Sequence, residues 1–420
     1  MKVLHISTSD MQGGAARAAY RLHKGLQNIN VNSQMLVQEK SSDNRAVFAP
    51  EIRLFQGIER AKLTFDALPL KFYTQRKNTT FSLQWIPDRT ASKVNQIDPD
   101  IINLHWVGAG FMQIESIAKL KRPLVVTLHD MWFFTGGCHV SGECDRYTIS
   151  CGACPQLHSS QDWDLSRWVW ERKAKAWKDL HPTIVSPSSW IAKCAGNSSL
   201  LKNLPIQVIP HGLDTQKYRP INQRVARELL NLPQDKQLIL FGAIQATSDS
   251  NKGFHLLQSA LRDLSKSSWQ DKLELVIFGA SQPNNPTDLG FKTHYLGHIN
   301  DDLSLAVIYS AADVMIVPSI QESFGQTASE SLACGTPVVA FNATGLKDII
   351  NHQQNGYLAI PYASEDLAAG IIWVLENQDR HQKLSLCARE KAEREFTLEN
   401  QARQYLALFE NILTNQKSII

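Results

Sequence analysis

Short apolar runs alternate with stretches in which apolar residues recur every three or four positions. In the first half, strand-like runs occupy 3–6, 33–38, 101–104, 124–128 and 183–186, and a helical pattern covers 15–27. In the second half, strand-like runs at 238–241, 273–278, 293–296, 314–317 and 337–341 alternate with helical patterns at 254–264, 303–310, 326–333 and 365–376. Strands that alternate with helices predict a parallel, doubly wound sheet in each half, so the fold class is α/β.

The length of 420 residues favours two domains of about 200 residues each. The segment Val208-Ile-Pro-His-Gly-Leu-Asp214 carries the Pro and Gly punctuation of a connector. We therefore predict an N-terminal domain over 1–207 and a C-terminal domain over 208–385. The charged helical stretch that follows, 386–420, is expected to cross back to the N-terminal domain.

Charge and hydropathy narrow the class of protein. No run reaches 18 consecutive apolar residues, and the opening apolar run is too short for a signal peptide, so we expect a cytoplasmic protein. The net charge is +3, but residues 1–210 hold 25 Lys and Arg against 17 Asp and Glu. A basic half suits an anionic partner such as a membrane surface, or reflects ordinary surface variation. Nothing resembles the dense basic stripe of a nucleic-acid-binding protein.

Residues 50–90 interrupt the alternation of strands and helices. Within them, 51–78 hold six basic and three acidic residues, interleaved with Phe55, Phe65, Phe72 and Tyr73. A basic, aromatic segment of this kind predicts peripheral contact with the inner face of the membrane. The alternative is a helical excursion that covers the core.

Ligands of open α/β sheets bind beyond the carboxyl ends of the strands, so the turns there are the candidate sites. The first turn holds Gly13-Gly14 and, three residues later, Arg17. Glycines allow close backbone approach to a phosphate, and the helix that follows favours anions, although such a pair is as often only a tight turn. The strand at 124–128 is followed by His129 and Asp130, where a histidine can face the cleft or be structural.

The turn after the strand at 314–317 carries the strongest signal, Glu322-Ser-Phe-Gly-Gln-Thr-Ala-Ser-Glu330. Gly325 opens a helix, so the first amides, at Gln326 and Thr327, are placed to meet an anion. Glu322 and Glu330 lie eight positions apart, a little over two helical turns, and can share one side. A carboxylate is well suited to accept paired hydroxyl groups from a ribose or a hexose, whereas a single Glu is more often a solvated acid.

These residues resemble the retaining glycosyltransferases of family 4, which have the GT-B fold of two Rossmann-like domains facing a central cleft. The features that carry the resemblance are the two glutamates with Ser323-Phe-Gly325, Ala333-Cys-Gly-Thr-Pro-Val-Val339, Gly345, Asn355-Gly-Tyr357, Lys252-Gly253 and Ile209-Pro-His-Gly-Leu-Asp214. They span nearly the whole chain and are densest over 209–376.

The resemblance implies a donor nucleotide sugar held mainly by the C-terminal domain. It assigns Glu330 to the ribose, Glu322 to the transferred sugar, and Lys252 with the amides of Gln326 and Thr327 to the diphosphate. Ser323, Phe324 and Gly325 are further donor-binding residues. It places Gly297, His298 and Ile299 at the base, Gly14 near the diphosphate and His129 beside the donor sugar. His129, Lys252 and Glu322 are accordingly the candidate catalytic residues.

The same resemblance implies retention of configuration, catalysis without a metal, and UDP-glucose as the first choice of donor. The acceptor implied is a glycan or a lipid-linked intermediate of surface polysaccharide (exopolysaccharide) synthesis. One departure stands out, because Ala243 occupies the position where many relatives carry an Arg. We expect Arg17 to supply the missing positive charge.

Four of the seven cysteines lie close together in a loop at 137–155: Cys138, Cys144, Cys151 and Cys154. A Cys-x2-Cys pair closed by two upstream cysteines is compatible with structural tetrahedral zinc, with free thiols or disulfides as the alternatives.

Two other functions are kept open. One is another GT-B nucleotide-sugar enzyme, such as an epimerase. The other is a non-enzymatic interaction module built on the four cysteines.

Overall fold

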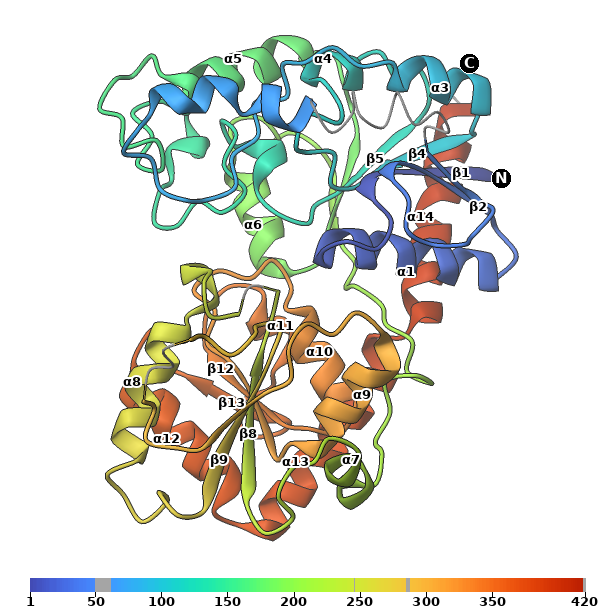
Figure 1. The fold of residues 1–420 in the computed structure, drawn as a ribbon. Helices are drawn as coiled ribbons and strands as arrows, with labels where there is room; N and C mark the ends of the chain where they lie inside the picture. The colour runs from blue at the N-terminus through green and yellow to red at the C-terminus, as the bar shows by residue number, and fades with distance from the viewer. Residues whose placement is uncertain (50–61, 245, 285–287, 418–420) are drawn as a thin grey trace. The chain divides into compact units, whose positions relative to one another are not determined.

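The computed structural model describes all residues except 50–61, 245, 285–287 and 418–420. Two compact units divide the chain: Met1–Gly212 with Glu399–Ile420, and Leu213–Leu398. Each contains one parallel sheet with helices on both faces, which confirms the predicted α/β fold class (Figure 1).

The sheet of the first unit has seven strands in the order β3-β2-β1-β4-β5-β6-β7, all parallel. The strands are β1 (Lys2–Ser9), β2 (Asn32–Glu39), β3 (Val47–Phe48), β4 (Ile101–Leu104), β5 (Leu124–Thr127), β6 (Thr183–Ser186) and β7 (Ile206–Val208). The helices are α1 (Gly14–Asn28), α3 (Thr90–Ile97), α4 (Ile114–Ile117), α5 (Leu165–Ala176), α6 (Ser189–Asn197) and α14 (Leu398–Lys417), with 3-10 turns η1 (Leu68–Phe72), η2 (Trp132–Phe134) and η3 (Arg146–Thr148).

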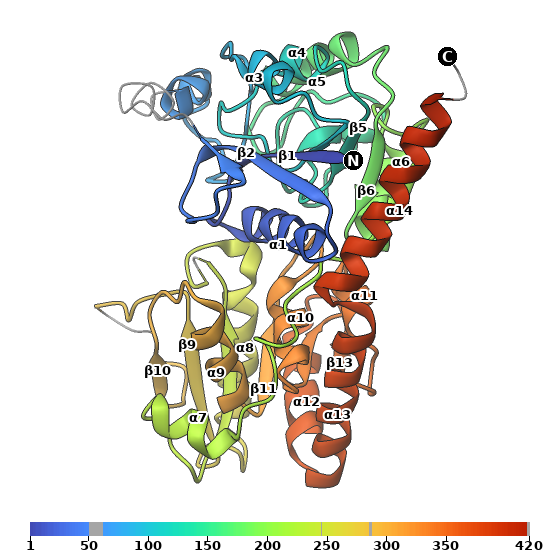
Figure 2. The ribbon, with the colours of Figure 1, turned by 90° about the vertical axis from the view of Figure 1, so that its right-hand side faces the viewer.

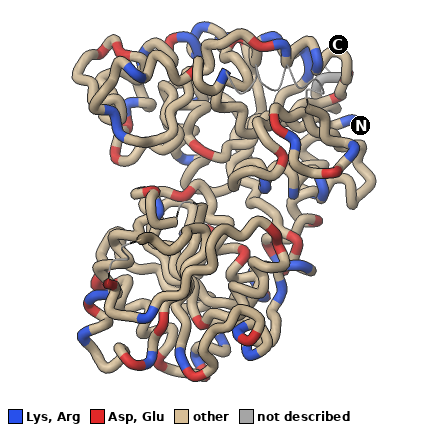
Figure 3. Tube along the Cα trace, in the orientation of Figure 1, with Lys and Arg blue, Asp and Glu red and all other residues tan. Residues whose placement is uncertain are grey.

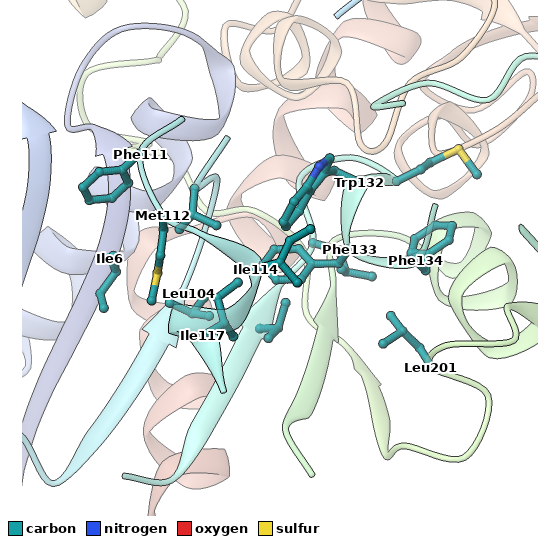
Figure 4. Close-up of a cluster of buried hydrophobic side chains, with 14 of the residues drawn as sticks. Ile6, Leu104, Phe111, Met112, Ile114, Ile117, Trp132, Phe133, Phe134 and Leu201 are labelled. Carbon is teal, nitrogen blue, oxygen red and sulfur yellow. The ribbon is translucent and has the colours of Figure 1, made fainter. Parts of the chain in front are cut away.

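Alternate residues of these strands enter two separate cores, as a pleated strand requires. One core lies against α3, α4, α5 and α6, and Figure 4 shows part of it, including Ile6, Leu104, Ile114, Ile117, Phe133 and Leu201. On the other face, Val3 and Val125 pack against α1 and α14, where Tyr405 and Phe409 are fully buried. Figure 2 shows α14 running beside β6, so the C-terminal helix completes the first unit.

The sheet of the second unit has six parallel strands in the order β10-β9-β8-β11-β12-β13. They are β8 (Gln237–Gly242), β9 (Leu273–Phe278), β10 (Thr293–Tyr295), β11 (Val314–Val317), β12 (Val338–Phe341) and β13 (Gly356–Ala359). α8 (Phe254–Leu264) and α12 (Ser364–Leu375) cover one face. The other face is covered by α7 (Gln223–Leu229), α9 (Asp302–Ala311), α10 (Gln326–Ala333), α11 (Leu346–Ile349) and α13 (Gln378–Glu395).

Both predicted domain boundaries differ from the structural division. Ile209 is fully buried in the core beneath α14, so the chain stays in the first unit as far as Gly212. At the other end, Ala388 and Ala392 of α13 are buried in a core of the second unit. The Arg389 guanidinium also donates to the carbonyl of Ala333 at 2.7 Å. Residues 386–398 therefore belong to the second unit, and the return to the first begins at Glu399.

The basic, aromatic segment predicted over 51–78 lies partly outside the described residues. Its described part contains a short helical stretch at 62–66 and η1. Phe65 and Phe72 are 55% and 87% exposed there. Among the described residues, no helix combines the length and the apolar character needed to cross a bilayer. Basic and acidic residues are interspersed over both units (Figure 3).

Candidate functional site

In the second unit, the order of the strands reverses between β8 and β11. Connections from these neighbouring strands leave in opposite directions there, and in open α/β sheets ligands bind beyond the carboxyl ends of strands at such a point. The loop after β8 runs through a 3-10 turn, η4 (Ser250–Lys252), and the loop after β11 carries Glu322. Sheet topology alone thus brings Lys252 and Glu322, 70 positions apart in sequence, to one place.

Lys252 and Glu322 form an ion pair at this point. Lys252 Nζ lies 2.6 Å from Glu322 Oε1, and the Ser319 hydroxyl donates to the same oxygen at 3.0 Å. Both charged side chains are mostly buried, 23% and 18% exposed. Burial alone would lower the pKa of Lys252, but the carboxylate of Glu322 outweighs it and raises that pKa. The lysine is therefore a permanent cation held by its partner.

The loop after β8 and the loop after β11 are held together by hydrogen bonds to backbone atoms and by close backbone packing. The Asn251 side chain donates to the carbonyl of Gln321 at 2.8 Å, and its oxygen accepts from the Gln321 amide at 3.1 Å. Gly253 adopts φ +69°, and a Cβ there would lie 1.9 Å from the carbonyl oxygen of Pro318. Only glycine permits this approach, so Gly253 sets the distance between the Lys252 loop and the end of β11.

The helix α10 begins next to this ion pair. Gly325, at φ +107°, is its N-cap, and the amides of Ala328 and Ser329 already bond to the Gly325 carbonyl. The amides of Gln326 and Thr327 precede these, in the turn where helical N–H groups lack intrahelical acceptors. The Phe324 ring is buried against Phe396, with ring centroids 5.7 Å apart. A ligand can therefore contact only the backbone of Phe324, so the predicted donor contact of this residue is limited to its backbone.

Glu330 occupies a different environment from Glu322. It is only 4% exposed, and the buried hydroxyl of Tyr309 donates to its Oε2 at 2.9 Å. The predicted ribose contact stays a prediction. Gly297 and Ile299 follow the edge strand β10 and are half-buried, whereas His298 between them is exposed. All three lie beyond the carboxyl end of β10, where the base contact is predicted.

The remaining predicted residues belong to the first unit. Gly13, at φ +90°, caps α1, so Gly14 and Arg17 lie in the first turn of the helix that follows β1. His129 follows β5 and is half-buried, with its ring stacked on His211 at a centroid distance of 5.0 Å. Burial lowers the pKa of His129 to about 4, with Asp130 opposing that effect. His129 is therefore a neutral imidazole at physiological pH.

A polar network behind His129 was not predicted from the sequence. Asp130 Oδ2 accepts from the Trp106 indole at 2.8 Å and lies 2.6 Å from His139 Nδ1. His139 Nε2 in turn lies 2.8 Å from the Ser82 hydroxyl. Burial alone would raise the pKa of Asp130, but His139 lowers it below its usual value. Asp130 is therefore an anion that organises the loop around it.

His105 was also overlooked, although a signal for it exists. It directly follows β4, as His129 follows β5 by one residue, and both are histidines beyond the carboxyl end of a buried strand. His105 is 1% exposed, and its Nδ1 lies 2.9 Å from His129 Nε2. The rule used to select His129 would have selected His105 as well.

The four clustered cysteines line one small cavity of about 20 Å³. All four are free thiols, and the Gly136 amide donates to the sulfur of Cys151 at 3.0 Å. Burial raises the pKa of the Cys138 and Cys151 thiols. Within the described part of the chain, no three His, Cys, Asp or Glu side chains are arranged as a metal site. Zinc at this cluster therefore stays a prediction.

Two family models match the chain, one in each unit. The model described as Glycosyltransferase Family 4 matches residues 12–217, and the model described as Glycosyl transferases group 1 matches residues 223–391. The second match contains both loops of the Lys252–Glu322 pair and the whole of α10.

Curated relatives match part of the chain. D-inositol 3-phosphate glycosyltransferase 2 of Catenulispora acidiphila is 31% identical over 188 residues, which is 42% of this chain and 43% of the relative. Mannosylfructose-phosphate synthase of Agrobacterium fabrum is 28% identical over 226 residues, 50% of this chain and 48% of the relative. The chain thus matches about half the length of these relatives.

Solved structures match over nearly the full length. Sucrose-phosphate synthase from Thermosynechococcus elongatus superposes with a TM-score of 0.69 at 20% identity, over 99% of this chain and 100% of the other. HepE from Anabaena, in complex with UDP and glucose, superposes with a TM-score of 0.66 at 18% identity, over 98% and 99% of the two chains. At this identity, the likeness bears on the fold alone.

Proposed function

Because the chain belongs to the family 4 glycosyltransferases and has the GT-B fold, we propose that it transfers a hexose from UDP-glucose with retention of configuration. The general activity, glycosyl transfer from a nucleotide sugar, follows from the family. UDP is the first choice of nucleotide because HepE, which shares the fold, is described in complexes with UDP and with UDP-glucose.

The observation that carries the proposal is the Lys252–Glu322 ion pair beside the N-terminus of α10. A leaving diphosphate develops negative charge, and a preorganised cation with helix amides stabilises such charge without a metal. In our proposal, Lys252 and the amides of Gln326 and Thr327 hold the diphosphate. Glu322 Oε2, the oxygen that faces neither Lys252 nor Ser319, accepts hydroxyl groups of the transferred sugar.

The predicted effect of removing this pair is large. Loss of one preorganised donor typically lowers the rate about 10²- to 10³-fold, so Lys252→Ala and Glu322→Ala should nearly abolish transfer. Lys266→Ala is the matched control, since Lys266 is 78% exposed on the surface of the same unit. Release of UDP from UDP-glucose measures the effect. Near-normal turnover by both loop variants would overturn the assignment.

The same assay separates the alternative enzyme class. An epimerase changes the sugar but releases no nucleoside diphosphate, whereas a transferase releases one equivalent per transfer. We expect release without added divalent cation and unchanged release in EDTA, because the positive charges come from the protein.

Arg17→Ala should weaken UDP binding if Arg17 replaces the cation absent at Ala243; an unchanged affinity would exclude that role.

We further propose a glycan or lipid-linked acceptor of surface polysaccharide synthesis, with peripheral membrane contact through 51–78. Within the described part of this segment, Leu63, Phe65, Leu68 and Phe72 are exposed next to Lys62 and Lys71. Such a surface suits an anionic bilayer. In co-sedimentation with vesicles containing 30% anionic lipid, Phe65→Ser/Phe72→Ser should lose most of the bound fraction. Exposed Leu386→Ser in the second unit is the control; equal binding by both variants would refute the proposal.

A further inference from the structure

Three histidines of the first unit form a hydrogen-bonded row across three neighbouring strands. His5 lies on β1, His105 follows β4 and His129 follows β5, and these strands are adjacent in the sheet. His5 Nδ1 is 2.9 Å from His105 Nε2, and His105 Nδ1 is 2.9 Å from His129 Nε2. His5 and His105 are buried, and only His129 at the end of the row is half-buried.

All three rings are neutral at physiological pH. Burial is the main cause in each case and lowers the pKa of His5 and His105 well below 6.5 and that of His129 to about 4. The charged or titratable neighbours that affect the row are His23 beside His5, His211 stacked on His129, and Asp130 next to His129. A neutral imidazole has one N–H donor and one bare nitrogen that accepts.

The two shared hydrogen bonds leave only two arrangements of protons. In one, His129 Nε2–H donates to His105 and His105 Nε2–H donates to His5, so His5 carries its proton on Nε2. In the other, His5 Nδ1–H donates to His105 and His105 Nδ1–H donates to His129, so His129 carries its proton on Nδ1. The choice at one end of the row therefore determines the tautomer at the other.

The buried end of the row decides between them. His5 is 0% exposed, and its Nε2 has no hydrogen-bond partner among the described residues. The first arrangement would place an N–H donor there without an acceptor, whereas the second leaves only a lone pair. Buried donors without partners are rarer than under-satisfied acceptors and carry a desolvation penalty of about 1–3 kcal/mol. The second arrangement is therefore favoured.

We propose that His5 and His105 are positioning residues that hold His129 in its Nδ1–H tautomer, so that His129 presents a hydrogen-bond donor to an oxygen atom of the donor sugar. His129 Nε2 is occupied by the proton of His105, which leaves His129 without a bare nitrogen to act as a base. The sugar contact rests on the proposed function, but the tautomer does not.

The tautomer can be measured in the full-length protein without any substrate. Long-range ¹H–¹⁵N correlation spectra of ¹⁵N-histidine-labelled protein distinguish protonated from bare ring nitrogens, and His129→Gln identifies the His129 signals. We expect His129 to be protonated on Nδ1 and His5 to be bare at Nε2. A His129 that is protonated on Nε2 would overturn the proposal, even if the enzyme transfers sugar normally.

A matched pair of variants then tests the action of His105. Asn and Leu have similar size, but only Asn keeps an amide N–H close to the position of Nδ1. His105→Leu should yield mixed His129 tautomers and lower kcat about tenfold or more with little change in KM, whereas His105→Asn should preserve both the tautomer and most of kcat. Equal losses with an unchanged His129 tautomer would assign His105 a structural role only. If the tautomer is as expected but no nucleotide sugar is turned over, the proposed function fails and the positioning inference stands.

Discussion

Glu322 has two carboxylate oxygens, and the fold uses only one of them. Oε1 receives both Lys252 and Ser319, and Oε2 makes no hydrogen bond within the described residues. Glu330 is the opposite case, because burial and the Tyr309 hydroxyl surround it. The two glutamates look equivalent in the motif but differ in how they can contact a ligand. Glu322 can offer a side-chain oxygen, whereas Glu330 is buried.

Gly253 allows a prediction that separates backbone strain from steric overlap. Gly253 and Gly297 have nearly equal φ values, +69° and +70°, but a Cβ at Gly297 meets nothing within 4 Å, whereas at Gly253 it meets Pro318 O at 1.9 Å. Gly297→Ala should lower the free energy of unfolding by about 1 kcal/mol, the typical penalty of a left-handed residue.

Gly253→Ala should lower the free energy of unfolding by at least about 2 kcal/mol more than Gly297→Ala, because the loops that follow β8 and β11 must separate. Urea unfolding of both variants measures the difference. Equal effects would show that the loops can part without loss of stability.

At the level of elements, α14 contacts strands that lie far from it in the sequence. The Tyr405 hydroxyl of α14 lies 2.9 Å from the Thr127 hydroxyl of β5, which itself donates to Asn103 of β4 at 2.9 Å. Helix α14 therefore adds Tyr405 to the hydrogen-bonded polar side chains Thr127 and Asn103 of the first sheet. The sequence pattern predicted a helix here, and its return to the first unit was expected, but the strands that it meets were not.

The loop at 137–155 supports a prediction about metal content. Its four cysteines line one cavity, and burial raises the pKa of the Cys138, Cys151 and Cys154 thiols, so these three stay neutral unless a cation ionises them. We predict about one zinc per chain in protein purified without chelators, measured by inductively coupled plasma mass spectrometry. Cys151→Ser should lower that content several-fold, and Cys387→Ser, at an exposed cysteine of the second unit, should not. Less than 0.2 zinc per chain in the unaltered protein would end the idea.

For the whole molecule, buried histidines make the first unit sensitive to acid. Five histidines of the first unit have a lowered pKa: His5, His23, His105, His129 and His211. In the unfolded chain their pKa is about 6.5, so below that pH the unfolded state binds protons that the folded state does not. Their contribution to stability is thus complete above pH 6.5 and is lost progressively as the pH falls below it, toward about 4 for His23 and His129.

We therefore predict that the first unit unfolds at lower urea concentration at pH 5 than at pH 7, with up to about 1.4 kcal/mol lost per histidine and pH unit. Tryptophan fluorescence reports this unit well, because eight of the ten tryptophans lie in it. His23→Gln should make the dependence on pH shallower, since His23, with a pKa of about 4, is one of the contributors. A stability independent of pH between 5 and 7 would contradict the assignment.

The sequence by itself determined the two doubly wound sheets and most of their strands, because these follow from local periodicity. Its motifs also singled out Lys252 and Glu322, but not the ion pair between them. It did not reveal β3, β7 or β13, three short edge strands, and it placed both domain boundaries some residues early. Only the tertiary structure decided that Phe324 and Glu330 are buried and that His5, His105 and His129 form one row. Those properties depend on which strands become neighbours, and neighbours in a parallel sheet are set by crossover connections rather than by nearby sequence.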